Sequence, residues 1–220
     1  MLDLLLPQRC LVCRLPGAQV CNSCRAELRR IVPPLCERCG APTAWPVRRC
    51  AECDGRRLAF ARVRAAVEYD APVRRIVAAW KERGLRRIAG WAAAIVADSV
   101  ARPDASLVTF VPGDPDRQLL RGHHAAERLA RELATVWDLP CASLLVRNRG
   151  SPRQRGLPQS ERRRNVAGAF RPLGPVQAAV VLIDDVYTTG ATVNAAASAL
   201  RRGGARAVQV VTFARTIRMR

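Results

Sequence analysis

Short apolar runs, many with β-branched residues, recur along the chain and alternate with longer stretches of helical character. The runs predict strands at Arg62–Tyr69, Ser106–Val111, Pro140–Val146, Ala179–Ile183 and Ala207–Ala214. The stretches predict helices at Ala71–Arg83, Leu85–Arg102, Arg117–Trp137, Leu157–Asn165 and Val193–Arg202. Gly84 separates the first two helices, and Gly203-Gly204 ends the last one. This alternation indicates an α/β fold with a parallel sheet flanked by helices.

Polar residues follow several of the predicted strands directly. Asp184 and Asp185 come after Ala179–Ile183, and the sharp turn Pro112-Gly113-Asp114-Pro115 follows Ser106–Val111. A basic run begins after Pro140–Val146. Ligands of parallel sheets bind at the carboxyl ends of the strands, so we expect these groups to meet in one cleft.

The segment after the acid pair has the character of a phosphate-binding turn. It contains Thr188, Thr189, Gly190, Ala191 and Thr192, and it opens the predicted helix Val193–Arg202. A strand, a tight turn and a helix in this order surround one point with backbone N–H groups, which suits a phosphate. The acids Asp184 and Asp185 are better suited to sugar hydroxyls and to a divalent cation held through water. No lysine follows the glycine, so this is not a Walker loop.

Eight of the nine cysteines form four CxxC pairs within residues 10–53. The pairs are Cys10/Cys13, Cys21/Cys24, Cys36/Cys39 and Cys50/Cys53. Two such knuckles complete a tetrahedral thiolate site, so we expect two structural zinc ions with sequential pairing. A crossed pairing is the open alternative, and disulfides are disfavoured if the chain is cytosolic. The ninth cysteine, Cys141, lies in an apolar stretch and is more simply a small core residue.

The chain carries 37 basic and 18 acidic residues, a net charge of +19. Such a charge favours a polyanionic partner, nucleic acid being the commonest. The segment Arg147–Arg171 contains eight arginines and one acid, and it is either an anion-binding loop or a solvated one. The only lysine, Lys81, could bind an anion, although a single lysine is more often solvated. No run reaches the ~18 apolar residues of a membrane span, and the N-terminus lacks a signal peptide's pattern, so we expect a cytoplasmic protein.

Two resemblances follow from these motifs. The stretch Ala179–Thr192 resembles the 5-phosphoribosyl 1-diphosphate (PRPP) motif of the type I phosphoribosyltransferases. Four cysteine pairs ahead of such a motif resemble the ComF (ComFC) family over essentially the whole chain. The matching segments are Val111-Pro112, Arg121-Gly122-His123-His124, Gln154…Leu157…Arg162…Asn165…Ala169-Phe170 and Asp184–Thr192. The resemblance implies a double zinc ribbon at residues 1–58 and a phosphoribosyltransferase-like domain at residues 59–220.

The resemblance also implies roles for individual residues. Pro112 and Gly113 would belong to a diphosphate-binding loop, with Arg121 as a further diphosphate ligand and Mg²⁺ as the cation bound with PRPP. A loop beginning at Arg147 would close over the reacting centre, with its anion contacts among the arginines Arg147, Arg149, Arg153 and Arg155. The family's usual aromatic-Asn pair is replaced here by His123-His124, which could donate similar hydrogen bonds or be ordinary core or surface histidines.

Three functions remain open from the sequence. The ComF resemblance implies a DNA-uptake protein that retains a PRPP or ribose 5-phosphate site and binds single-stranded DNA. A DNA-uptake helicase or a recombination mediator would then be a candidate partner. The alternatives are an active transferase that joins PRPP to an amine or base, and a PRPP-sensing regulator. The acid pair and threonine loop serve all three.

Overall fold

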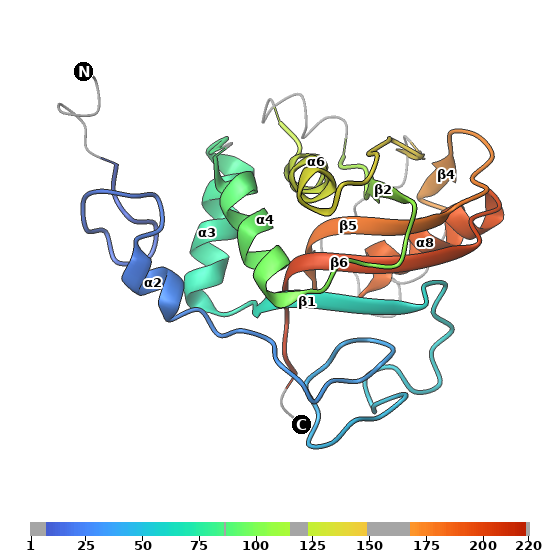
Figure 1. Cartoon of the computed structure of the whole chain (residues 1–220), viewed down its shortest axis with the longest axis horizontal. Coiled ribbons are helices and arrows are strands. Elements are labelled where there is room, and N and C mark those ends of the chain that lie inside the picture. The colour runs from blue at the N-terminus through green and yellow to red at the C-terminus, as the bar shows by residue number, and fades with distance from the viewer. Residues whose placement is uncertain (1–7, 86, 115–122, 149–167, 219–220) are drawn as a thin grey trace, which may run out of the picture.

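The computed structural model describes residues 8–85, 87–114, 123–148 and 168–218 (Figure 1). Its helices are α2 (Asn22–Ala26), α3 (Ala71–Glu82), α4 (Ile88–Ser99), α6 (Ala125–Trp137) and α8 (Ala191–Arg202). Its strands are β1 (Arg62–Glu68), β2 (Leu107–Phe110), β3 (Leu145–Arg147), β4 (Phe170–Pro172), β5 (Ala179–Tyr187) and β6 (Ala207–Arg215). None of the helices in these ranges is long and apolar enough to cross a membrane.

The main sheet has four strands in the order β1-β6-β5-β2, and every neighbouring pair is parallel. The predicted fold class, a parallel sheet flanked by helices and preceded by a cysteine-rich module, is therefore confirmed. Because the strands are parallel, the acidic residues of β5 lie at the same edge of the sheet as the turn after β2.

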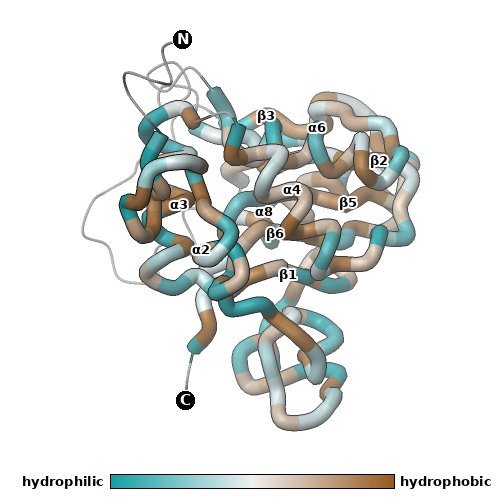
Figure 2. The backbone as a smooth tube through the Cα atoms, turned by 60° about the vertical axis from the view of Figure 1, so that its left-hand side comes forward, coloured by the Kyte–Doolittle hydropathy of each residue, from teal (hydrophilic) through white to brown (hydrophobic). Residues whose placement is uncertain are grey.

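Both faces of the sheet are buried, which explains why its strands read as continuous apolar runs. Side chains of β5 alternate between the faces: Val181 and Ile183 pack with α3, α4 and α6, whereas Val180 and Leu182 pack with α8. Figure 2 shows the hydrophobic colouring concentrated in the sheet strands, in contrast to the more polar loops below them. Trp80 is fully buried, and Trp91 packs at the edge of the same core.

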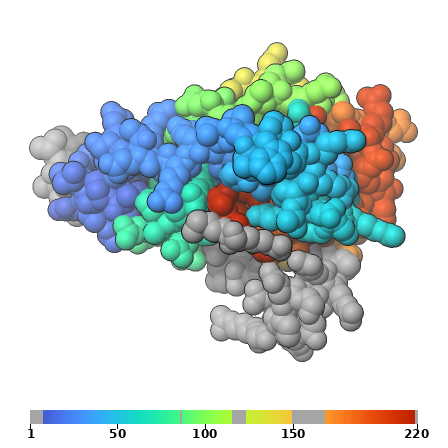
Figure 3. All heavy atoms as spheres, turned by 90° about the horizontal axis from the view of Figure 1, so that it is seen from below, coloured from blue at the N-terminus to red at the C-terminus, as the bar shows by residue number. Residues whose placement is uncertain are grey.

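The cysteine-rich segment forms two separate units on either side of β1. The first ribbon, residues 8–28, packs beside α3, and the second ribbon, residues 35–57, lies below β1 (Figure 1). Between them the chain runs along the outer edge of β1, where Ile31 N donates to Ala66 O at 3.0 Å and Val63 N donates to Arg38 O at 3.0 Å. Seen from below, the N-terminal residues form a continuous band over this face (Figure 3). The ribbons thus cover an edge that would otherwise offer unpaired backbone groups.

Some elements differ from their predicted bounds. Strand β5 continues through both acids to Tyr187, because β6 is long enough to pair with it as far as Arg215. The run 140–146 does not add a parallel strand to the main sheet: Cys141 makes an isolated bridge to Val108, and Leu145–Arg147 pairs with Phe170–Pro172 in a separate antiparallel sheet. Helix α6 begins at Ala125, while residues 117–122 and the predicted helix 157–165 lie outside the described residues.

Two glycines of the second ribbon allow the contact with β1 to be tested. Gly40 and Gly55 both have a φ of +65°, but a Cβ on Gly40 would lie 2.5 Å from Val63 O, whereas one on Gly55 would meet nothing within 4 Å. We expect Gly55→Ala to cost about 1 kcal/mol for the left-handed backbone alone. Gly40→Ala should cost at least about 1 kcal/mol more, because the ribbon must move away from the strand. Denaturant unfolding of the zinc-loaded protein measures both, and equal losses would contradict the packing described.

Candidate functional site

The eight paired cysteines form two clusters with the geometry of tetrahedral metal sites. Within each cluster the sulfur atoms lie within 4.8 Å of one another, and the clusters are Cys10, Cys13, Cys21 and Cys24, and Cys36, Cys39, Cys50 and Cys53. In the first, the Sγ atoms of Cys13 and Cys21 are 3.7 Å apart; in the second, Cys36 and Cys53 are also 3.7 Å apart. Tetrahedral Zn–S bonds of about 2.3 Å place sulfurs about 3.8 Å apart, so both clusters fit zinc with all four positions filled by protein. The grouping is the sequential one predicted.

One thiol in each cluster has a pKa below the ordinary value for cysteine. Burial opposes ionisation of Cys10, but backbone N–H groups of its knuckle, including that of Cys13, outweigh it and lower its pKa to about 6. In the same way, N–H groups of Cys39 and Arg38 outweigh burial and lower the pKa of Cys36 to about 7. Thiolates are the form that binds metal, so each cluster offers one ligand in that form before zinc binds, whereas burial raises the pKa values of Cys24 and Cys39, which zinc must overcome.

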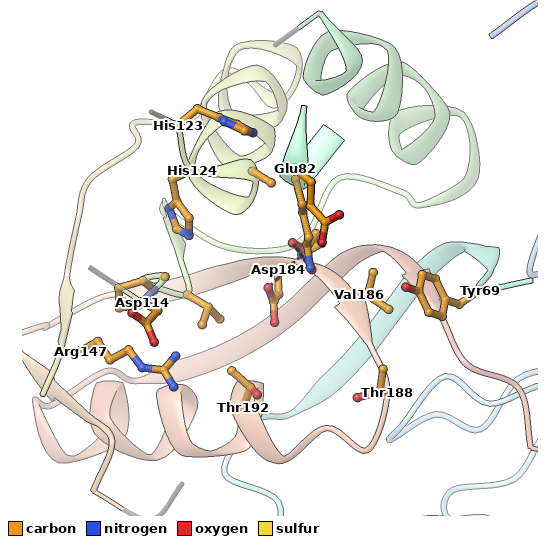
Figure 4. A pocket seen from close by; sticks show the side chains of 16 residues that line it. Tyr69, Glu82, Asp114, His123, His124, Arg147, Asp184, Val186, Thr188 and Thr192 are labelled. Carbon is orange, nitrogen blue, oxygen red and sulfur yellow. Dashed lines mark hydrogen bonds and ion pairs between the residues drawn. The ribbon is translucent and has the colours of Figure 1, made fainter. Parts of the chain in front are cut away.

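A pocket of about 460 Å³ opens at the carboxyl ends of β2 and β5 (Figure 4). It brings together the acid pair, two threonines of the predicted phosphate turn, the turn after β2 and the start of the basic run. Its lining residues are Tyr69, Lys81, Glu82, Val111, Pro112, Gly113, Asp114, His123, His124, Ala125, Arg147, Asp184, Asp185, Val186, Thr188 and Thr192. The convergence expected from parallel strand ends is therefore present among the described residues.

Asp184 and Asp185 lie within the C-terminal half of β5 rather than after the strand. Asp185 is buried, and its backbone N–H donates to Asp184 Oδ1 at 2.9 Å. Burial and the neighbouring Asp185 carboxylate raise the pKa of Asp184 to about 7, from an ordinary value of 3.8. At neutral pH this pocket therefore holds a carboxyl group that a bound cation or hydrogen-bond donor would help to ionise.

The sequence left Lys81 as either an anion ligand or, more simply, a solvated lysine, and the structure instead pairs it with a carboxylate of the pocket. Its Nζ lies 2.7 Å from both carboxylate oxygens of Asp185, and the side chain is half-buried at the pocket wall. Burial disfavours the ammonium, but the carboxylates of Asp185 and Asp184 outweigh it and raise the pKa of Lys81. The composition of the chain could have indicated a special role for Lys81. It is the one lysine among 37 basic residues, and an ammonium is a more compact cation than a guanidinium.

The predicted phosphate turn connects β5 to α8. Gly190 has a φ of +74° and caps the helix, and a Cβ there would lie 2.3 Å from Tyr187 Oη, so the turn requires glycine. Thr189 Oγ1 accepts from Ala191 N at 3.3 Å and stabilises the turn itself. Thr188 and Thr192 line the pocket, whereas Thr189, Gly190 and Ala191 form the turn behind them.

The opposite wall contains the two histidines. The His124 side chain reaches into the pocket (Figure 4), and its ring packs edge-on against Phe110 with centroids 5.6 Å apart. Burial lowers the pKa of His124, so its imidazole is neutral at physiological pH. His123 Nε2 lies 2.7 Å from Trp80 O, which ties this wall to α3. Arg121, a predicted diphosphate ligand, lies outside the described residues.

Arg147 is the described member of the predicted anion loop. It ends β3, lines the pocket and lies over the Phe170 ring with its guanidinium carbon 5.5 Å from the centroid. Arg149, Arg153 and Arg155 lie outside the described residues. The pocket thus offers ammonium, guanidinium, hydroxyl and carboxylate groups to one ligand, a combination suited to a molecule with both anionic groups and hydroxyls.

The fold and the two clusters define a class: two cysteine-rich, zinc-ribbon-like units joined to a parallel α/β sheet domain. Residues 1–55 match the family model of the double zinc ribbon domain. DNA utilization protein YhgH of Salmonella typhimurium is 32% identical over 97% of this chain and 100% of its own length. Competence protein F of Haemophilus influenzae is 27% identical over 94% and 96%, and competence protein ComFC of Bacillus subtilis is 27% identical over 91% and 86%.

The chain therefore belongs to the family of DNA utilization protein YhgH and the competence proteins F and ComFC, the ComF family that its motifs resemble. Similar solved structures include glutamine PRPP amidotransferase from Bacillus subtilis, with 23% identity and a TM-score of 0.40 over 58% of this chain and 25% of that one. Purine phosphoribosyltransferase from Pyrococcus horikoshii has 14% identity and a TM-score of 0.33 over 60% and 84%.

The raised pKa of Asp184 has a consequence for stability. The folded carboxyl titrates near 7 and the unfolded one near 3.8, so the folded protein retains a proton that the unfolded chain has released. This group therefore makes the protein less stable as pH rises from about 4 to about 7. We expect Asp184→Asn to raise the melting temperature, and to raise it more at pH 8 than at pH 5.5. Melting curves at both pH values, with exposed Asp104→Asn as the control, test this; a gain independent of pH would contradict it.

Proposed function

We propose that this protein binds PRPP or ribose 5-phosphate in the pocket at the ends of β2 and β5, and that it binds single-stranded DNA as part of DNA uptake or utilisation. The observation that carries the proposal is the convergence of the acid pair, Thr188, Thr192 and two cationic side chains on one pocket. The names of the relatives supply the DNA-related context.

In this proposal the 5-phosphate sits at the turn before α8. The N–H groups of the first helical turn and the hydroxyls of Thr188 and Thr192 are its donors, and the helix dipole favours its negative charge. Asp184 and Asp185 then accept hydrogen bonds from the ribose hydroxyls. Lys81 holds Asp185 in place and reduces the repulsion between the acids and the incoming anion.

The donor set also suits a magnesium ion. Mg²⁺ prefers carboxylate, water and phosphate oxygens, and the raised pKa of Asp184 marks a carboxyl whose burial Lys81 and Arg147 offset only in part. When bound, the ion would neutralise charge on the diphosphate. Pro112, Gly113 and Arg121 are the proposed diphosphate contacts, with Arg147 approaching from the side of β3.

We propose DNA binding because the chain is strongly basic and because its sequence relatives are named for DNA utilisation and competence. The net charge of +19 favours a phosphate backbone, and the chain has only four Trp, two Tyr and four Phe for base stacking. Contacts that depend on charge rather than base identity should then dominate. The proposed DNA contacts include Arg149, Arg153 and Arg155 and the arginines of the ribbons, whereas Arg147 belongs to the pocket.

Neutralising the acid pair should separate the two ligands. We expect Asp184→Asn with Asp185→Asn to abolish binding of Mg²⁺-PRPP while leaving single-stranded DNA affinity within about twofold, because DNA contacts are cationic. Fluorescence anisotropy across a salt series measures DNA binding, and calorimetry measures PRPP binding. DNA affinity should fall steeply with salt and respond little to PRPP.

The control for that experiment is Asp54→Asn with Asp104→Asn, which changes the net charge equally at exposed acids outside the pocket. This variant should retain PRPP binding. If the pocket variant is folded and loses both ligands together, the separation of the two sites is wrong. If the wild type binds PRPP but no DNA at physiological salt, the DNA half of the proposal fails.

A second candidate function is transfer of the phosphoribosyl group to an amine or base. One observation favours it: the neutral imidazole of His124 reaches into the pocket opposite the acid pair, where it could accept a proton from the attacking nucleophile. The transfer would form a bond from the acceptor nitrogen to the ribose anomeric carbon and release diphosphate.

Turnover has a direct readout. If the protein is a transferase, mixing it with Mg²⁺-PRPP and a panel of ammonia, amines and nucleobases should release diphosphate, and His124→Ala should slow that release by about 10²-fold or more without abolishing PRPP binding. Enzyme-coupled diphosphate detection measures the rate. PRPP binding with no diphosphate release from any acceptor in the panel would favour the binding function.

A further inference from the structure

The second ribbon contacts the proposed phosphate turn directly. Arg56, three residues after the last zinc-binding cysteine, donates from Nη2 to the backbone oxygen of Thr189 at 2.7 Å. The same guanidinium donates from Nη1 to Glu52 O at 3.4 Å, within the last cysteine knuckle. One side chain therefore joins the last cysteine knuckle to the turn before α8.

The segment that follows the second ribbon also forms hydrogen bonds with the first turn of α8. Asn194 Oδ1 accepts from Ala59 N at 2.8 Å, and Asn194 Nδ2 donates to Arg57 O at 3.3 Å. The backbone N–H of Asn194 in turn donates to Gly190 O at 2.9 Å. The segment that leaves the second ribbon is thus bonded to the helix that begins at the turn.

The buried guanidinium of Arg215 connects the second ribbon to Tyr187, the residue beneath the turn. Arg215 is completely buried, donates from Nη1 to Cys39 O and forms an ion pair with Glu52 at 2.8 Å. Its guanidinium carbon lies 5.2 Å from the centre of the Tyr187 ring, and Tyr187 is the residue against which Gly190 packs. Both ends of the second ribbon's metal cluster are therefore bonded to elements that shape the turn.

The contacts of the first ribbon go elsewhere. Arg25 pairs with Asp98 on α4 at 3.1 Å, and Arg75 on α3 donates to Val12 O at 3.2 Å. The two zinc sites are chemically alike, but they are attached to different parts of the sheet domain.

We infer that Arg56 is a positioning residue for the phosphate turn, and that through it the second zinc ribbon sets the affinity of the turn for the 5-phosphate. The inference rests on the proposed function and names the residue that prepares its site. The physical reason is the planarity of the peptide bond: in a trans peptide the C=O and the following N–H point in opposite directions. Arg56 holds the Thr189 oxygen, so the Gly190 N–H must face away from the ribbon, as an anion-binding turn requires.

The matched test uses neighbouring arginines. Arg56 and Arg57 carry the same charge and line the same groove, but the Arg57 side chain is exposed and this residue bonds α8 through its backbone oxygen. We expect Arg56→Ala to weaken binding of ribose 5-phosphate and Mg²⁺-PRPP about tenfold or more, since a hydrogen bond from a charged donor is lost. Arg57→Ala should change it less than twofold. Arg56→Lys, which keeps the charge but not the two-pronged geometry, should fall between them.

A second readout separates positioning from direct contact with the ligand. In the ligand-free protein, Arg56→Ala should speed amide hydrogen exchange in residues 188–192, while zinc analysis still finds two ions per chain. Faster exchange with weaker binding supports the inference. Unchanged exchange with weaker binding would overturn it and make Arg56 a direct ligand.

The remaining outcomes also test whether Arg56 positions the turn. Equal weakening by Arg57→Ala would overturn the inference in favour of a general charge effect, and full-strength binding by Arg56→Ala would overturn it outright. If the wild type binds neither ribose 5-phosphate nor PRPP, the proposed function fails and the link to affinity fails with it. Hydrogen exchange then still reports by itself whether Arg56 holds the turn.

Discussion

The buried guanidinium of Arg215 is the interaction on which the arrangement of sheet, ribbon and turn depends. It ends β6, directly after the core residues Phe213 and Ala214, and it is completely buried. An unpaired charge in such a place costs several kcal/mol. The second ribbon supplies both of its polar partners, Glu52 and the backbone oxygen of Cys39. The cation therefore holds the ribbon against the sheet at the point where β5 turns into α8.

That constraint bears on the organisation of the chain. The division at residue 58 remains a prediction, but hydrogen bonds cross it on both sides of the sheet. The first ribbon packs with α3 and α4, and the second packs with α8 and the end of β6. Because zinc binding is folding energy for such knuckles, each metal also supports the part of the sheet domain that its ribbon covers. The two metals need not matter equally to the pocket.

The pocket itself balances opposing electrostatic effects. Parallel pairing with β6 brings Asp184 and Asp185 to the open end of the sheet, where burial and mutual repulsion disfavour two negative charges. Lys81 pairs with Asp185, whereas Lys81 and Arg147 offset only part of the burial and repulsion that raise the pKa of Asp184. Such residual strain is common where a site is prepared for a ligand rather than for maximum stability. A hydroxyl-bearing or cationic ligand would remove it.

Many of the functional motifs of this protein are formed by residues that are close together in the sequence. The apolar run of β5, the acids, the threonine turn and α8 are consecutive, so their order alone predicted a phosphate-binding arrangement. The cysteine spacings likewise predicted both clusters, because each knuckle closes over a few residues. Pattern could not show that β5 extends to Tyr187 or that the run 140–146 leaves the main sheet, since both depend on which strand is available for pairing.

The sequence by itself therefore determined the fold class, the metal ligands and the residue types that carry the chemistry. Only the tertiary structure decided which distant groups join them. Lys81 meets Asp185 across 104 residues, and Arg56 meets Thr189 across 133. The physical reason is that strand order and helix placement bring these groups together, and neither is encoded in the spacing of any one motif.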